Sequence, residues 1–133
     1  MLRNTKYYKF ASAIFAFLLW GGWSFYINTQ VSNLVRGVVA GFVQGVSSFT
    51  ITLFIAFLIE RQFNFYKKAW AKLIFPPILT VLLTGSALIL VHILFSTPDI
   101  IKTITPALTV AFIFAEFSNL KLYKRLKATR GRN

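Results

Sequence analysis

Four long apolar stretches, separated by short polar segments, run along the chain. They cover about residues 10–28, 37–59, 73–95 and 98–120. A helix rises about 1.5 Å per residue, so roughly 20 apolar residues cross the hydrocarbon core of a bilayer. Each stretch is long enough to do so, although Lys102 and Glu116 interrupt the last one. The pattern predicts an all-α membrane protein in which residues 1–133 form one integral membrane domain of four transmembrane helices, arranged as two hairpins.

The composition supports this class and excludes several others. Hydrophobic residues make up 56% of the chain and charged residues only 14%, whereas about a quarter of a soluble domain is charged. An aromatic content of 17% excludes a disordered chain, because such chains are poor in aromatic residues. The absence of cysteine excludes disulfides, cysteine-ligated metal sites and thiol nucleophiles.

The basic residues fall almost entirely on one side of the predicted membrane. Of the 15 Lys and Arg residues, all but Arg36 and Lys102 precede the first stretch, lie between the second and third, or follow the fourth. Segments rich in Lys and Arg stay in the cytoplasm. We therefore expect a multi-pass protein of the bacterial inner membrane with both termini in the cytoplasm.

The formal net charge of +12 indicates contact with anionic lipid rather than with nucleic acid, because the charge is divided among segments that flank apolar helices. Each basic residue near an anionic membrane surface contributes about 1 kcal/mol of attraction. In the tail 121–133, six basic residues are expected to contact lipid headgroups: Lys121, Lys124, Arg125, Lys127, Arg130 and Arg132.

The stretch 37–59 carries the clearest motif. Gly37, Gly41 and Gly45 form two overlapping Gly-x-x-x-Gly units. Small residues at this spacing let two helices approach closely within a membrane. We expect this face to be a helix-packing seam, and it is also a candidate interface between copies of the chain.

Polar residues within the stretches form a second pattern, and it has two interpretations. The residues concerned are Gln44, Ser47, Ser48, Thr52, Thr109 and Glu116. An unpaired polar group is costly in lipid, so these side chains should face protein or water. Either they line a pore or substrate path, or they hold helices together, with Glu116 paired to Lys9, Arg61 or Lys121.

The fourth stretch is expected to turn a polar face into the bundle, because Thr105, Thr109, Glu116 and Asn119 fall on one side of a helix. Before it, the sequence Ser-Thr-Pro-Asp predicts a helix start at which Thr97 caps the first turn.

Prolines and the single histidine add local expectations. Pro76–Pro77 should lie in the first turn of the third helix, where a missing N–H costs nothing. Pro106 should remove a hydrogen bond inside the fourth helix. His92, near the outer end of the third stretch, is either a hydrogen-bonded interfacial residue or a proton relay.

No motif indicates an enzyme. His92 and the candidate acid Glu116 lie toward opposite membrane faces, and the sequence has no phosphate-binding loop, dinucleotide-binding glycine motif or HExxH zinc motif. We therefore expect a protein that is not an enzyme and has no cofactor and no bound metal.

Two functions remain open. The first is a helix-packing subunit, or an assembly or accessory component, of a membrane complex, with lipids and either itself or a larger membrane protein as partners. The second is a small homo-oligomeric transporter or channel for an ion or a lipid-linked substrate. We favour the first, because the polarity of the stretches is modest and one acidic residue offers little capacity for coupling.

Overall fold

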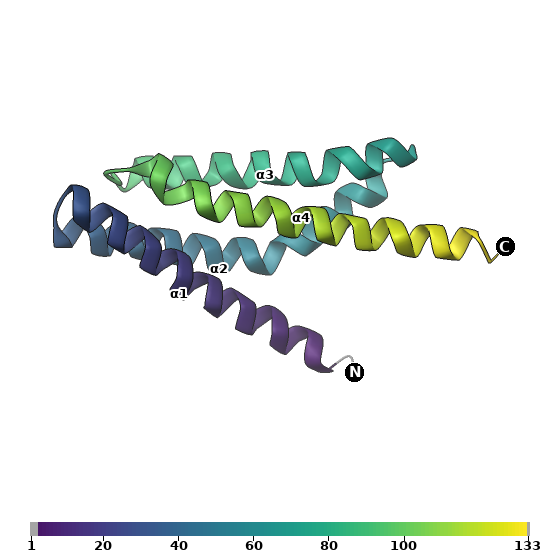
Figure 1. The fold of residues 1–133 in the computed structure, drawn as a ribbon, viewed down its shortest axis with the longest axis horizontal. Coiled ribbons are helices and arrows are strands. Elements are labelled where there is room, and N and C mark those ends of the chain that lie inside the picture. The colour runs from purple at the N-terminus through teal and green to yellow at the C-terminus, as the bar shows by residue number, and fades with distance from the viewer. Residues whose placement is uncertain (1–2, 133) are drawn as a thin grey trace.

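The computed structural model describes residues 3–132, with side chains from Lys6 to Arg132. It consists of four helices: α1 (Arg3–Val31), α2 (Leu34–Phe65), α3 (Ala69–Leu94) and α4 (Ile100–Arg130). Consecutive helices are antiparallel, so both ends of the chain and the α2–α3 connection (66–68) lie at one end of the bundle (Figure 1). We call this the basic end. The connections 32–33 and 95–99 lie at the opposite end.

All four helices are long and apolar enough to cross a membrane. This confirms the prediction of an all-helical protein with four such helices. The helices extend beyond the predicted stretches, since α2 continues to Phe65 and α4 continues through most of the predicted tail to Arg130. Large apolar side chains cover the outside; Phe15, for example, is 65% exposed. Such a surface suits a lipid environment and is rare on a soluble monomer.

The glycines of α2 lie against α1 of the same chain. A Cβ atom added at Gly41 would lie 3.0 Å from the Phe25 Cβ and 3.1 Å from the Gly21 carbonyl oxygen. One added at Gly37 would collide with the Thr29 hydroxyl, and one at Gly45 would lie 3.0 Å from the Phe17 ring. The two backbones therefore touch, and α1 covers the face on which these glycines lie.

The pair Pro76–Pro77 lies well inside α3, not in its first turn as the sequence analysis expected. The helix begins at Ala69, so each proline leaves one helical carbonyl without its usual N–H partner. These carbonyls belong to Lys72 and Leu73. Both accept a hydrogen bond of 2.9 Å from the Asn119 side-chain nitrogen of α4. The start of this helix was mispredicted because the sequence gives no local sign of Asn119, a donor that lies 46 residues from Leu73.

A side chain from another helix also compensates for Pro106. This proline lies inside α4 and cannot donate to the Lys102 carbonyl. The indole N–H of Trp23 on α1 donates to that carbonyl instead, at 2.9 Å. Each proline within a helix is thus matched by a donor from a neighbouring helix.

The residue that caps the start of α4 differs from the predicted one. Asp99 is the N-cap, and its carboxylate accepts a hydrogen bond of 3.1 Å from the Lys102 N–H. Thr97 was expected in that role, but its hydroxyl binds the ring of His92.

At the end of α3, the N–H groups of Ser96 and Thr97 donate to the carbonyls of Ile93 and His92, the pattern of a Schellman motif. Ser96 takes the left-handed conformation (φ 53°) that this motif requires.

Toward the basic end, the helices pack around Ile55, Ile59 and Ala115, of which Ile59 and Ala115 are fully buried. Next to this cluster, Lys72 of α3 is only 9% exposed. Its Nζ donates at 2.8 Å to the carbonyl of Phe63, one of the free carbonyls in the last turn of α2. The ammonium group also lies 4.5 Å from the centre of the Phe63 ring. Lys72 therefore caps α2 from a neighbouring helix.

Candidate functional site

Asn28 joins α1 to the α3–α4 connection and to α4. The residue is fully buried. Its Nδ2 donates at 2.8 Å to both the Ser24 carbonyl and the Thr103 hydroxyl, and its Oδ1 accepts from the Asp99 N–H at 2.9 Å. Ser24 in turn donates to the Ala40 carbonyl of α2 at 2.8 Å. Both the oxygen and the nitrogen of the Asn28 amide group thus form hydrogen bonds.

His92 joins α3 to α2 and is also fully buried. Its Nε2 lies 2.7 Å from the Gln44 Oε1, and its Nδ1 lies 2.7 Å from the Thr97 hydroxyl. The Gln44 nitrogen donates to the Ser48 hydroxyl at 3.0 Å. Because the Gln44 oxygen can only accept, Nε2 donates, and in a neutral ring Nδ1 then accepts from Thr97.

These residues form a polar cluster near the opposite end of the bundle, and we use that name for Ser24, Asn28, Gln44, Ser48, His92, Thr97 and Thr103. All seven are buried, and their hydrogen bonds connect all four helices. The cluster therefore holds the bundle together by directional contacts, which apolar packing alone does not supply in a membrane.

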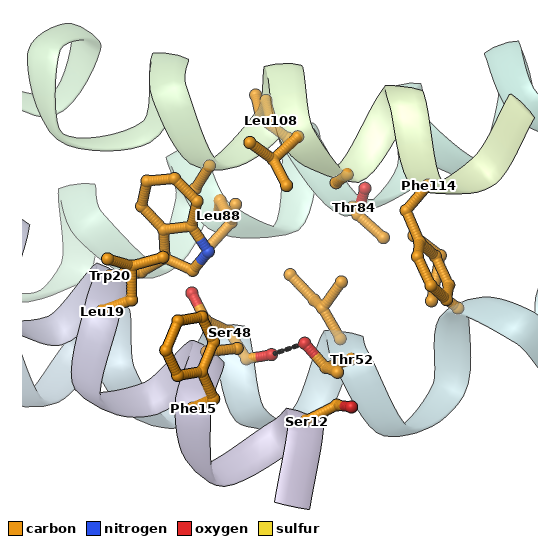
Figure 2. A pocket seen from close by; sticks show the side chains of 16 residues that line it. Ser12, Phe15, Leu19, Trp20, Ser48, Thr52, Thr84, Leu88, Leu108 and Phe114 are labelled. Carbon is orange, nitrogen blue, oxygen red and sulfur yellow. Dashed lines mark hydrogen bonds between the residues drawn. The ribbon is translucent and has the colours of Figure 1, made fainter. Parts of the chain in front are cut away.

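Beside the polar cluster, toward the basic end, lies a cavity of about 270 Å³. Its walls come from all four helices and are mainly apolar (Figure 2). Prominent lining residues are Phe15, Leu19 and Trp20 of α1, Ile51 of α2, Leu88 of α3 and Phe114 of α4. It lies between α1 and α4, which touch over a short stretch only, whereas α1 packs closely on α2. We call it the lateral cavity.

The two threonine hydroxyl groups that border the lateral cavity are used within their own helices. Thr52 donates to the Ser48 carbonyl at 2.7 Å, drawn as a dashed line in Figure 2, and Thr84 donates to the Thr80 carbonyl at 2.8 Å. Figure 2 also shows the indole nitrogen of Trp20 on the cavity side of its ring. The cavity therefore offers a mainly apolar surface, and its remaining polar groups are the Trp20 N–H and the hydroxyls of Ser12 and Ser48.

A second hollow, a groove of about 290 Å³, lies on the α1–α2 pair. It is apolar, and Gly21, Gly22 and Gly41 form part of it, with the rings of Phe17 and Phe42 beside them. A Cβ added at Gly22 would meet nothing within 4 Å. We call it the glycine groove.

The structure does not bring all of the predicted lining residues together. Ser48 and Thr52 border the lateral cavity, and Gln44 lies one turn away in the polar cluster. Ser47 is half-buried and is not among the residues that line the cavity. Thr109 is exposed on α4.

The fourth helix does not turn its whole polar face inward. Thr105 and Thr109 are exposed, and their hydroxyls donate to the carbonyls of Ile101 and Thr105. A threonine that donates to its own helix can face lipid at little cost, which is why the expected direction was wrong. Asn119, by contrast, is fully buried.

Glu116 is half-buried and does not form the expected ion pair. Among the side chains of residues 6–132, the one ion pair joins Lys102 to Asp99 at 3.6 Å. The side chains of Lys9, Arg61 and Lys121 are exposed. In the same part of the chain, no three His, Asp or Glu side chains gather where a metal ion could bind.

Comparison with known proteins adds no further assignment. No model of a protein family, no curated protein and no solved structure matches this chain.

The sequence analysis missed Asn28, Thr103, Trp20 and Lys72. Asn28 and Lys72 lie at the edges of apolar stretches, where polar residues are ordinary, so their burial was not apparent.

Proposed function

We propose that this protein is an integral membrane protein that binds the apolar chain of a membrane lipid, or of a lipid-linked molecule, in the lateral cavity. The observation that carries the proposal is the cavity itself, which has a volume of about 270 Å³ and apolar walls from four helices. An apolar cavity bordered by diverging helices in a bilayer is filled most readily by hydrocarbon, because no water is present there to compete.

The size of the lateral cavity favours a flexible chain. The cavity lies in the gap between α1 and α4, which still contact each other over a short stretch. A partner helix about 10 Å wide would have to part these two helices, whereas a single acyl or isoprenoid chain is narrow enough to enter. Thr52 and Thr84 present no free donor to the occupant, since both hydroxyls are bound within their own helices.

The polar cluster supports a binding role over an ion path. Gln44, Ser48 and His92 are the polar residues that an ion path through the bundle would use, and they bind one another. An ion would have to displace those contacts, and each buried group left without a partner costs about 1–3 kcal/mol.

The orientation in the membrane belongs to the same proposal. Both termini and the α2–α3 connection lie at the basic end, where all Lys and Arg residues except Arg36 and Lys102 are found. The positive-inside rule then favours a bacterial inner-membrane protein with this end in the cytoplasm. Its exposed Lys121, Lys124 and Arg125 are placed to contact anionic headgroups.

Photolabelling tests the proposal. The full chain is reconstituted in lipid nanodiscs that contain a phospholipid with a photoreactive group on its acyl chain, and the labelled residues are mapped by mass spectrometry. We expect label on cavity residues such as Leu88 and Trp20. The variant Ala111→Phe fills the cavity and should lower this labelling several-fold.

The matched control is Ile113→Phe, which adds the same ring on the exposed side of α4 and outside the cavity. It should leave labelling of Leu88 and Trp20 unchanged, and both variants should keep the helical content and elution volume of the wild type. Equal labelling of Leu88 in the wild type and in a folded Ala111→Phe variant would refute the proposal.

The glycine groove favours a second candidate function, a subunit that packs against another membrane protein. The groove is on the outside of α1 and α2, so a partner helix can insert a ridge of side chains there without entering the bundle. Gly22→Leu would fill the groove. Under this function, the variant should abolish crosslinking to a second chain or a larger partner, and it should leave labelling of the lateral cavity intact.

A further inference from the structure

A small pocket at the basic end gathers cationic side chains from two distant parts of the chain. Its volume is about 60 Å³, several times the roughly 10–15 Å³ that a cavity needs to hold one water molecule. Its polar lining consists of Lys67 and Lys72 from the α2–α3 connection and the start of α3, and of Tyr123, Lys127 and Arg130 from the last turns of α4. We call it the basic pocket.

Among the residues that the structure describes, no acidic side chain lines the basic pocket. The chain has three acidic residues, Glu60, Asp99 and Glu116, and none of them lines the pocket. Among the side chains that the structure describes, the one ion pair lies at the opposite end of the bundle. Four positive charges around one hollow repel one another unless an anion lies between them.

Lys72 distinguishes the basic pocket from an ordinary charged surface. The residue is only 9% exposed, and its position is fixed by a 2.8 Å bond from Nζ to the Phe63 carbonyl. One of the three ammonium N–H donors is used in this bond and the Phe63 ring lies 4.5 Å from Nζ, so Lys72 contributes mainly its positive charge to the pocket.

We propose that the basic pocket binds a phosphate group. Lys127 and Arg130 would hold it from α4, Lys67 from the α2–α3 connection, and the Tyr123 hydroxyl would donate one further hydrogen bond. A planar guanidinium and several ammonium groups are the usual ligands of phosphate oxygens. The phosphate group belongs either to a phospholipid headgroup or to a soluble phosphorylated compound. A headgroup can reach the pocket because the pocket lies at the end of a bundle that spans the membrane.

This inference is independent of the lipid chain in the lateral cavity. The α4 residues of the cavity, such as Ala107 and Ala111, lie nearer the opposite end than Tyr123 and Arg130. The variant Ala111→Phe should therefore leave phosphate binding unchanged, and loss of phosphate binding should leave photolabelling of the cavity unchanged. The two proposals can fail separately.

Two probes separate the sources of the phosphate. The full chain is titrated with inorganic phosphate in neutral detergent, followed by phosphorus NMR. In parallel, it is reconstituted in phosphatidylcholine nanodiscs with increasing phosphatidic acid, and the lipids that it retains are counted by native mass spectrometry. Saturable binding of phosphatidic acid, with no binding of inorganic phosphate, assigns the site to a headgroup. Saturable binding of inorganic phosphate that displaces phosphatidic acid assigns it to a soluble phosphate compound.

Two double variants decide the proposal; each removes two positive charges from α4, one pair inside the basic pocket and one pair outside it. The double variant Lys127→Gln and Arg130→Gln should weaken binding about tenfold or more in total, since each of these two exposed cations contributes up to about fivefold. The matched control, Lys121→Gln with Lys124→Gln, removes the same charge from positions that are equally exposed but lie outside the pocket, and it should change binding less than about twofold. Equal weakening by the two double variants, or absence of saturable binding by both probes, would overturn the proposal.

Discussion

The side chain of Asn119 on α4 takes the place of the backbone N–H that Pro76 lacks on α3. Its nitrogen lies 2.9 Å from the Lys72 carbonyl, which residue 76 would bind in an uninterrupted helix. The same nitrogen lies 2.9 Å from the Leu73 carbonyl, which residue 77 would bind. One primary amide, with its two N–H donors, thus repairs both gaps left by Pro76–Pro77.

We expect Asn119→Leu to destabilise the bundle by about 1–3 kcal/mol, because two buried carbonyls lose their partner. The free energy of unfolding is measured by reversible titration with a denaturing detergent, followed by circular dichroism. The control replaces Pro76 and Pro77 with alanine, which restores the two helical N–H groups. In that background Asn119→Leu should cost much less, and an undiminished cost would show that Asn119 acts through some other contact.

The crossing of α1 and α2 gives a second prediction. Gly41→Ile should destabilise the chain by about 1–3 kcal/mol, the usual cost of overpacking, because its Cβ would lie 3.0 Å from that of Phe25. Gly22→Ala is the matched control, since a Cβ there meets nothing within 4 Å. It should be neutral or stabilise by up to about 1 kcal/mol, the helix preference of alanine over glycine. Equal effects of the two variants would contradict the close crossing.

The helices themselves could be predicted from the sequence because each is specified by a local property, a run of apolar residues of sufficient length. The prolines show where that reasoning stops. A double proline within a helix is unfavourable on local grounds, so α3 was expected to begin at about residue 73, with the prolines in its first turn, and not at Ala69. The compensating donor, Asn119, is on another helix, and its contact depends on the packing of the whole bundle.

The candidate site was harder to predict for a related reason. Gln44 and Ser48 could be identified as a polar face by their spacing, but their partner His92 is 48 residues away from Gln44. The face of Thr109 was misjudged, because a threonine hydroxyl can be satisfied by its own helix and then gives no information about direction. The lateral cavity is formed by all four helices and has no signature in any one of them.

The proposed orientation predicts opposite locations for two reporter fusions. A cytoplasm-active reporter fused after Asn133 should be active, because the basic end carries most of the Lys and Arg residues and should remain inside. The same reporter inserted in the α1–α2 connection, after Ser32, should be inactive, while a periplasm-active reporter there should be active. Activity of the periplasmic reporter at the C-terminus would refute this orientation.

His92 and Gln44 provide the last prediction. His92→Leu leaves the Gln44 oxygen and the Thr97 hydroxyl buried without their shared partner. Each such loss costs about 1–3 kcal/mol, so the variant should be clearly less stable than the wild type.

Gln44→Leu should have a cost of similar size, because it leaves Nε2 of His92 without an acceptor. The double variant should cost less than the sum of the two, since replacing both partners removes the unpaired groups as well as the bond. Thr105→Val serves as the control: its hydroxyl is exposed and bound to the Ile101 carbonyl of its own helix, so the change should stay within about 0.5 kcal/mol. Unfolding titrations of these four variants measure the coupling directly. Additive costs for His92→Leu and Gln44→Leu would mean that the 2.7 Å contact contributes nothing to holding α2 and α3 together.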